Sequence, residues 1–491
     1  MAAIVQDQAA TFTIPGPRPI PGLGRTGNLL QFARDPIGIL SNLFRTYGSI
    51  AALVEGGKTR IISPYPDCPG SVFVYGAELN RKVITDSESY QKSALGGVNS
   101  SMTRRQEVMW NWGTGLFNVN GDTHRQHRRL LMPAFHKKQI EAYRDDMVAI
   151  TQQVLDGWET GQQRDIQSEM TYLSLYIAGK TLFGEDILHS KSSVGLTLQQ
   201  MVKGLLQPSL ILFSYDLPGL PYRRLLDISE RGDREIREVI AAKRAHGNDD
   251  SDVLSMLLNA QDEDGTTLTD DEVIGHAGII FMAGHETSAN ALTWTLLLLS
   301  QHAEIAAALQ DELSSVLNGA APTVEQLASL PLLERVVKES MRVLPPVPLN
   351  HRIIAEPTEL GGYLLPAHSE VFVSIYHTHH DPELYPQPDK FDPDRWLTIN
   401  PSPFEYSPFS AGPRMCIGAP FAMMEIKLVL AMLLQRYRLE FIPGTRLDRR
   451  ARITMAPRQG LPMKVFAQDR QFNRGVGGLR GNVSEMVEWP E

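Results

Sequence analysis

One of the two cysteines in this 491-residue chain lies in the segment FSAGPRMCIG, residues 409–418. Cys416 stands there just before an apolar run, APFAMMEIKLVLAMLLQRY, that predicts a helix. A cysteine acts as a metal ligand or nucleophile in its thiolate form, which a helix N-terminus or a metal favours. The alternatives are a buried structural thiol and a catalytic nucleophile, although no His or Asn lies close in sequence. A zinc site would need further Cys or His at close spacing.

A second segment with possible chemistry is AGHETS, in the middle of a long apolar stretch. Glu286 and Thr287 place an acid beside an alcohol. On a helix, a threonine hydroxyl can bond to the carbonyl four residues earlier, and Gly284 leaves room for a small ligand. The alternative is a threonine that only packs in the core.

Two charged pairs have helical spacing. Glu339 and Arg342, in KESMR, are three residues apart and share a helix face. His124 and Arg128, in GDTHRQHRRLLMPAFHKK, are four apart and also share a face. Taken alone, the first pair predicts a surface ion pair and the second a solvated basic face.

These segments together resemble one family. Its heme-binding signature is Phe-x-x-Gly-x-Arg-x-Cys-x-Gly, and the chain fills every fixed place with Phe409, Gly412, Arg414, Cys416 and Gly418. The chain is similar to cytochrome P450s from about residue 15 to 465, with the other segments in the family's order. The resemblance implies a mainly α fold with small β-sheets, in which a long central helix lies over a heme and the cysteine loop beneath it.

The resemblance also implies roles for these residues. Cys416 is the expected thiolate ligand of the iron of heme b, a ligand that favours O–O cleavage, and Phe409 and Gly418 bind the cofactor with it. Glu286 and Thr287 deliver protons while dioxygen is activated. The implied reaction is hydroxylation or epoxidation by a monooxygenase.

Two further groups follow from the resemblance. The heme propionates are expected to bind His124, Arg128, Arg352 and Arg414 by charge-assisted hydrogen bonds. Glu339, Arg342 and Arg395 of FDPDRW are expected to form a buried structural network under the heme, with Trp396 where the family usually has Phe.

The family's substrate-facing positions fall here on Trp110, Trp112, Ala283, Val347, Pro348 and Met455. They are mostly apolar, which favours a hydrophobic substrate such as a fatty acid, terpenoid or steroid-like molecule, oxidised with O2. The apolar segment 205–222 is a candidate lid, a membrane-contacting segment or ordinary core packing.

Electrons are expected from NAD(P)H through a separate ferredoxin or flavodoxin and its reductase, because the chain has no dinucleotide fingerprint and no four-cysteine cluster pattern. Basic residues off the His124–Arg128 face offer a docking surface for an acidic donor, or only a solvated helix: Arg125, Arg129, Lys137 and Lys138. The rival hypotheses are a heme-thiolate gas sensor and a peroxide-driven or isomerising enzyme that needs no redox partner.

The whole composition sets limits. The net charge of −9 argues against a nucleic-acid-binding protein. Two cysteines cannot form a disulfide framework, and the N-terminus shows no signal or anchor pattern, so we expect a cytoplasmic monomer without a membrane anchor.

The elements that must position these residues can also be predicted. We expect a flexible N-terminus over residues 1–13, one heme domain over 14–467, and a loose Gly-rich tail over 468–491. KTRIISPYP and SVFVYG predict strands. The segment from Asp270 is apolar almost all round, as in a helix through a large core. Its HETS cluster argues against a transmembrane helix.

Overall fold

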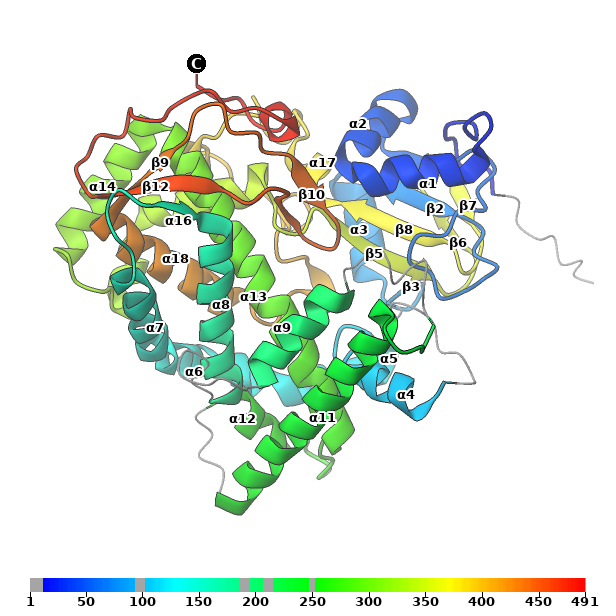
Figure 1. Cartoon of the computed structure of the whole chain (residues 1–491). Helices are drawn as coiled ribbons and strands as arrows, with labels where there is room; N and C mark the ends of the chain where they lie inside the picture. Colours follow the sequence, from blue (N-terminus) through cyan, green and yellow to red (C-terminus); the bar gives the residue numbers. More distant parts are fainter. Residues whose placement is uncertain (1–11, 93–101, 185–193, 206–214, 247–251, 491) are drawn as a thin grey trace, which may run out of the picture.

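The computed structural model describes residues 12–92, 102–184, 194–205, 215–246 and 252–490. Helices predominate, and the sheets are small (Figure 1). The α-helices of the described residues are α1 Gly24–Arg34, α2 Pro36–Tyr47, α3 Ala77–Thr85, α4 Arg104–Asn111, α5 Gly121–Leu131, α6 Lys137–Ala142, α7 Arg144–Asp156, α8 Ile166–Phe183, α9 Val194–Leu205, α11 Pro221–His246, α12 Val253–Asn259, α13 Asp270–Gln301, α14 Ala303–Leu317, α15 Val324–Ala328, α16 Pro331–Val343, α17 Ile375–His379 and α18 Ala419–Arg436. Short 3-10 helices are η1 Met132–Phe135, η2 Pro393–Leu397, η3 Gly412–Arg414 and η4 Asn482–Glu485.

A five-stranded sheet in the order β1-β2-β8-β5-β3 lies beside α1, α2 and α3 (Figure 1). Within it, β2 and β8 are parallel and the other neighbours antiparallel. A three-stranded sheet has the order β4-β12-β9, and two hairpins pair β6 with β7 and β10 with β11. The strands are β1 Ile50–Ala52, β2 Ser71–Val74, β3 Tyr90–Gln91, β4 Gln163–Asp165, β5 Leu349–Ile354, β6 Thr358–Leu360, β7 Tyr363–Leu365, β8 Glu370–Ser374, β9 Tyr437–Phe441, β10 Arg449–Ala451, β11 Met455–Pro457 and β12 Pro462–Ala467.

The helix predicted from Asp270 is α13, which runs through the middle of the molecule for 32 residues. It begins with a capping box, in which the Thr269 hydroxyl and the Glu272 carboxylate each accept from the other's backbone N–H. Its C-terminal half, from Ser288 to Gln301, is buried throughout and packs against α8, α16 and α18. In the described part of the chain, no helix combines the length and apolar character needed to cross a membrane.

One predicted strand is wrong. SVFVYG contains β2, but KTRIISPYP over residues 58–66 forms no strand. The buried carboxylate of Glu370, on β8, accepts hydrogen bonds from the backbone N–H groups of Ile61 (2.9 Å), Ile62 (2.6 Å) and Ser63. A side chain therefore satisfies the donors that a neighbouring strand would otherwise satisfy.

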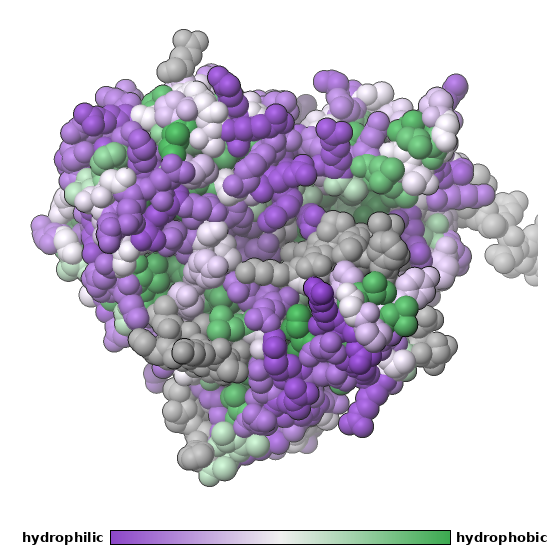
Figure 2. Space-filling view, in the orientation of Figure 1, coloured by the Kyte–Doolittle hydropathy of each residue, from purple (hydrophilic) through white to green (hydrophobic). Residues whose placement is uncertain are grey.

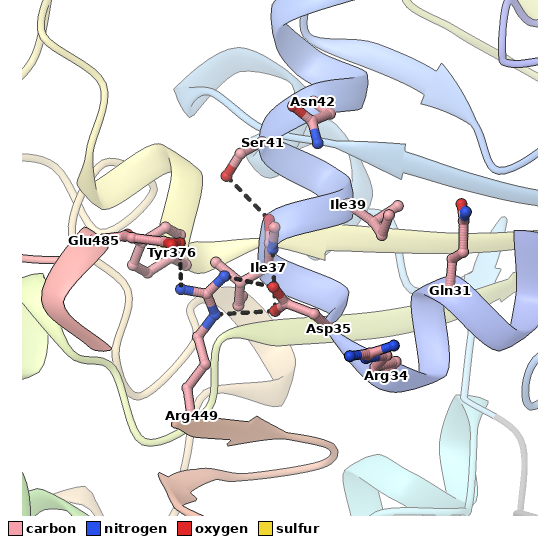
Figure 3. A pocket seen from close by; sticks show the side chains of 11 residues that line it. Gln31, Arg34, Asp35, Ile37, Ile39, Ser41, Asn42, Tyr376, Arg449 and Glu485 are labelled. Atoms are coloured by element: carbon pink, nitrogen blue, oxygen red, sulfur yellow. Dashed lines mark hydrogen bonds and ion pairs between the residues drawn. The ribbon is translucent and has the colours of Figure 1, made fainter. Parts of the chain in front are cut away.

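The Gly-rich segment after residue 467 is not a loose tail. Val483 and Met486 are fully buried. Arg449, on β10, ties this segment to the start of α2, since its guanidinium donates to both carboxylate oxygens of Asp35 (Figure 3). The same guanidinium donates to the carbonyl of Asn482. The buried apolar side chains in GNVSEMVEW thus hold this segment against the fold despite its high glycine content. At the other end, most of the expected flexible N-terminus, residues 1–11, lies outside the described residues.

A surface cleft of about 720 Å³ opens where α2 meets this C-terminal segment. Figure 3 shows its lining, in which Arg449 pairs with Asp35 and with Glu485 beside Tyr376. None of the residues predicted for catalysis or cofactor binding lines this cleft. The reaction site therefore has to be built from other elements.

Candidate active site

The loop that carries Cys416 follows η3 and leads directly into α18. Gly412 has φ +64°, and a Cβ there would lie 3.3 Å from the Ile84 carbonyl oxygen, so this turn favours glycine. The Cys416 N–H donates to the Phe409 carbonyl at 2.9 Å. The predicted signature residues thus form one closed turn that fixes the cysteine.

The sulfur of Cys416 is accessible, although protein atoms surround it closely. Burial raises the pKa of this thiol above its ordinary value, while the backbone N–H of Gly418 and the charge of Arg128 lower it to a smaller extent. Burial therefore opposes the stabilisation of a thiolate that the sequence suggests for a cysteine at a helix N-terminus. A metal bound to the sulfur would supply the missing stabilisation.

The middle of α13 has an open face, although residues 273–278 and 288–301 on either side of it are buried. Ala283 is exposed, and Gly284, Glu286 and Thr287 are partly exposed. The Thr287 hydroxyl donates to the Ala283 carbonyl at 2.7 Å, which is the bond the sequence predicted. A Cβ added to Gly284 would meet nothing within 4 Å. A flat or small ligand can approach the helix at this point.

Four predicted basic residues come together from three elements: His124 and Arg128 from α5, Arg352 from β5 and Arg414 from η3. Burial and the neighbouring arginines lower the pKa of His124 to about 4. Burial and Arg414 lower the pKa of Arg352 to about 9, and burial and Arg128 lower that of Arg414 to about 10. The group therefore carries positive charge that is poorly compensated.

Sequence reasoning missed Lys92, which belongs to the same group. Its ammonium group is buried, donates to the Asn350 side chain at 3.0 Å and lies 4.2 Å from the centre of the Phe117 ring. Burial, Arg352 and Arg414 hold its pKa well below the ordinary value. A single lysine after a short strand gives no sequence signal, because only the fold places it among arginines.

This cluster fits the heme that the sequence implies. Among the described residues, no carboxylate forms an ion pair with any of these five basic side chains. Two buried nitrogen atoms, Arg352 Nη2 and Arg414 Nε, have no hydrogen-bond partner there. Buried cations without anions are costly. The two propionates of heme b would supply both the charge and the acceptors, with Cys416 available to the iron.

The structure brings the predicted network of Glu339, Arg342 and Arg395 together. The Glu339 carboxylate, fully buried on α16, accepts from Arg342 at 2.9 and 3.0 Å and from Arg395 at 3.2 Å. It also accepts from the indole of Trp396 at 3.0 Å. This contact gives a reason for tryptophan at that position, since phenylalanine has no donor. The carboxylate joins α16 to η2.

The predicted substrate contacts divide into two sets. Ala283 is exposed, and Trp110 and Val347 are partly exposed. Trp112 and Met455 are buried in the hydrophobic core, and their assignment as substrate contacts stays a prediction. Trp112 packs against Gly278 of α13, and the carbonyl of Met455, on β11, accepts from the Trp294 indole at 3.0 Å. Pro348 is buried as well.

Neighbouring acids compensate most of the predicted basic docking surface. Arg125 pairs with Asp122, and Arg129 pairs with Asp262. Lys137 lies 3.7 Å from Glu141. Lys138 is exposed nearby. Met132 and Met415 are also exposed, each at 46%.

Comparison with known proteins gives the same family over nearly the whole chain. The family profile described as Cytochrome P450 matches residues 15–461. Cyclooctatin synthase of Streptomyces melanosporofaciens is 33% identical, over 91% of this chain and 95% of its own. Cyclooctat-9-en-7-ol 5-monooxygenase of the same organism is 31% identical, covering 89% and 91%. Pentalenene oxygenase of Streptomyces avermitilis is 30% identical, covering 88% and 92%.

Solved structures agree with the fold. A retinoic acid-bound cyanobacterial CYP120A1 has a TM-score of 0.75 and 26% identity, covering 93% of this chain and 100% of its own. The heme domain of cytochrome P450DA has a TM-score of 0.78 over 94% and 99% of the two chains, at 24% identity.

Proposed function

This chain belongs to the cytochrome P450 family and is a monooxygenase with heme b as cofactor, and from that premise we propose that it hydroxylates or epoxidises a hydrophobic terpenoid. The observation that carries the proposal is the open face of α13 at Ala283, Gly284 and Thr287. Three relatives named for oxidation of cyclooctatin-type compounds or pentalenene favour a terpenoid over a fatty acid or a steroid.

In the proposed site, the basic side chains orient the cofactor. His124, Arg128, Arg352, Arg414 and Lys92 would hold the propionates, and Cys416 would bind the iron. When bound, heme activates dioxygen and transfers one of its oxygen atoms to the substrate. The chain contributes binding, orientation and proton delivery.

Proton delivery is assigned to Thr287 and Glu286. The Thr287 hydroxyl donates to the Ala283 carbonyl, so its oxygen lone pairs can accept a hydrogen bond from water or from the Glu286 carboxyl group. When the bond to Ala283 opens, the hydroxyl becomes a donor towards the open face. Glu286, the residue before Thr287, is partly exposed and would exchange protons with solvent.

Electrons are proposed to come from NAD(P)H through a separate ferredoxin or flavodoxin and its reductase. Since most local arginines pair with acids, the docking face would combine Lys138 with the exposed Met132 and Met415. A cytoplasmic monomer suits a chain with two unpaired cysteines.

The test of the heme site is the absorption spectrum of the dithionite-reduced protein under carbon monoxide. We expect the strongly red-shifted Soret band of thiolate-ligated heme in the wild type and its loss in Cys416→Ser. Cys68 is the control, because its buried thiol lies far from the loop in sequence, and Cys68→Ser should keep the band. An unchanged band in Cys416→Ser would refute the ligand assignment.

The test of proton delivery is Thr287→Ala, assayed with a reconstituted ferredoxin system and a terpenoid substrate panel. We expect NADPH consumption to continue while the fraction recovered as oxidised product falls roughly tenfold or more, with hydrogen peroxide formed instead. Thr293→Ala is the matched control, because Thr293 makes the same bond to Ala289 at 2.7 Å but is buried. Full coupling in Thr287→Ala would remove its role. Product formed with hydrogen peroxide alone would favour the partner-free alternative.

A further inference from the structure

A short segment between α4 and α5, residues 116–120, holds part of the basic cluster together. The Phe117 ring centre lies 4.2 Å from the Lys92 ammonium nitrogen. Asn120 pairs with the backbone of Lys92, accepting from its N–H at 2.9 Å and donating to its carbonyl at 2.7 Å. Arg414 donates at 2.6 Å both to the Asn120 side-chain oxygen and to the preceding backbone carbonyl. One segment thus contacts two cations from distant parts of the chain.

The groups that this segment offers to the cations are a carbonyl, an amide and an aromatic ring, none of which carries a net charge. They can hold a guanidinium or an ammonium group in place by hydrogen bonds or by a cation–π contact. They do not cancel its charge, as a carboxylate would. The positive charge therefore stays available for an anionic ligand, and the positions of the cations depend on the position of the segment.

The segment begins where the chain lies directly against α13. Gly115 packs on Gly275 there, since a Cβ added to Gly115 would lie 2.5 Å from the Gly275 carbonyl oxygen. A Cβ added to Gly275 would lie 2.7 Å from Oγ1 of Thr114. Two glycines thus allow the two backbones to approach closely. This approach brings the next residue, Leu116, to the side chain that follows Gly275 on α13.

The backbone of Leu116 is fixed by a chain of hydrogen bonds with one direction. Its N–H donates to Nδ1 of His276, on α13, at 3.1 Å, so this nitrogen carries no proton. The proton of the neutral ring is on Nε2, which donates to Nδ1 of His127, on α5, at 3.1 Å. His127 then carries its proton on Nε2, which lies 3.4 Å from the Glu272 carboxylate. Both rings are buried, and burial and His127 lower the pKa of His276 to about 3, which keeps it neutral.

Glu272 fixes the far end of this chain of hydrogen bonds. Its other carboxylate oxygen closes the capping box of α13 by accepting from the Thr269 N–H at 2.8 Å. His127 directly precedes Arg128, a member of the basic cluster. The chain of bonds therefore ties both α5 and the segment before it to the first turns of α13.

We propose that His276 and His127 are positioning residues for the cofactor: they hold the segment 116–120 on α13, and this segment sets where the basic cluster meets the heme propionates. The inference rests on the proposed heme site, because it takes the basic cluster as the propionate site. Neither histidine is assigned a contact with the cofactor, and both act through the segment.

The experiment measures the rate at which the ferric holoenzyme loses hemin to an excess of apomyoglobin, followed by absorption. His276→Leu removes the acceptor for the Leu116 N–H. His276→Asn keeps an acceptor, because the asparagine amide lies where the histidine Nδ1 does. His302→Leu is the matched control, because His302 lies at the other end of α13 and bonds to the Leu298 carbonyl at 2.8 Å.

His276→Leu should lose hemin roughly threefold to tenfold faster than wild type, the range expected for one buried hydrogen bond. His276→Asn should stay within roughly twofold of the wild-type rate, and so should His302→Leu. Equal rates in His276→Leu and wild type would overturn the inference, and so would equally fast loss in both His276 variants.

A second variant keeps the inference testable if His276→Leu does not fold. Phe117 is 43% exposed, so Phe117→Leu removes the ring beside Lys92 with little risk to the fold. It should also lose hemin faster than wild type.

The reduction potential of the heme separates positioning from a merely structural role. When the cations move away from the propionates, ferrous heme loses stabilisation by positive charge. In His276→Leu and Phe117→Leu, the ratio of ferrous to ferric heme at a fixed potential should fall by up to roughly tenfold, or about 59 mV for one electron. Faster hemin loss without a change in potential would mean that the cations have not moved, and would refute the inference.

Arg352→Gln distinguishes this inference from the proposed heme site. Arg352 is buried, and its Nη2 has no hydrogen-bond partner among the described residues, so its removal should speed hemin loss directly. If Arg352→Gln behaves as wild type, the proposed propionate site is wrong. If it loses hemin faster while His276→Leu and Phe117→Leu do not, only the role of the histidines is refuted.

Discussion

At the scale of single residues, Glu425 is the acid that the proposed reaction does not use. It lies on α18, nine residues after Cys416, and is buried beside Ser174 of α8 and Ser288 of α13. Its Oε1 has no hydrogen-bond partner among the described residues. Burial raises the pKa of this carboxyl from 4.5 to about 7, although the two serine hydroxyls oppose the shift.

This shift makes stability depend on pH. An acid whose pKa is higher in the folded state holds its proton more tightly there, so the free energy of unfolding decreases as pH rises from about 4.5 to about 7. The full loss is of the order of 3 kcal/mol, at about 1.4 kcal/mol per pKa unit. Glu425→Gln should therefore be more stable than wild type at pH 8 and lose this advantage at pH 5.

The measurement is the urea midpoint of wild type and Glu425→Gln at pH 5, 6, 7 and 8. Buried histidines such as His276, whose pKa burial lowers to about 3, also make stability depend on pH. They are the same in both proteins, so the difference between the two curves reports Glu425. A difference that stays constant from pH 5 to pH 8 would contradict the raised pKa.

Local chemistry was the easiest to predict from the sequence. The bond from Thr287 to Ala283 follows from a helix and a spacing of four. The raised pKa of the Cys416 thiol does not follow from the sequence, which shows the helix N-terminus but not the burial that causes the shift. Desolvation depends on all surrounding atoms, and those come from the whole fold.

At the scale of elements, the segment from Asp270 predicted α13 because it is long and apolar almost all round, as in a helix through a large core. The segment 58–66 was predicted as a strand and is not one, because Glu370, more than 300 residues away, binds its backbone donors. A short apolar stretch thus takes its structure from the available partner.

The ion pairs on the basic face of α5 show the same limit of prediction from sequence. Arg125 is paired with an acid on its own helix, which spacing can predict. Arg129 is paired with Asp262, a residue that only folding brings to it. Arg105 of α4 is a further example, because the three acids with which it forms ion pairs lie more than 100 residues later in the chain.

At the scale of the whole molecule, the C-terminal segment closes the fold. Met486→Ala should lower the free energy of unfolding by about 2–5 kcal/mol, the usual cost of truncating a buried methionine. Ser484→Ala, at an exposed neighbouring position, should change it by no more than about 0.5 kcal/mol. Urea midpoints of the three proteins test this. Equal midpoints would mean that the segment contributes nothing to the free energy of unfolding, as the prediction of a loose tail implies.

The sequence by itself determined the family, the mainly helical class, the cysteine loop and the acid–alcohol pair, because each depends on residues within one short segment or on one helical period. The tertiary structure alone decided which charges remain uncompensated. Lys92 joins Arg352 and Arg414 from distant segments, Trp112 and Met455 turn into the core, and Arg105 reaches α11. Burial and ion pairing are properties of neighbours in space, and spacing along a chain does not encode them.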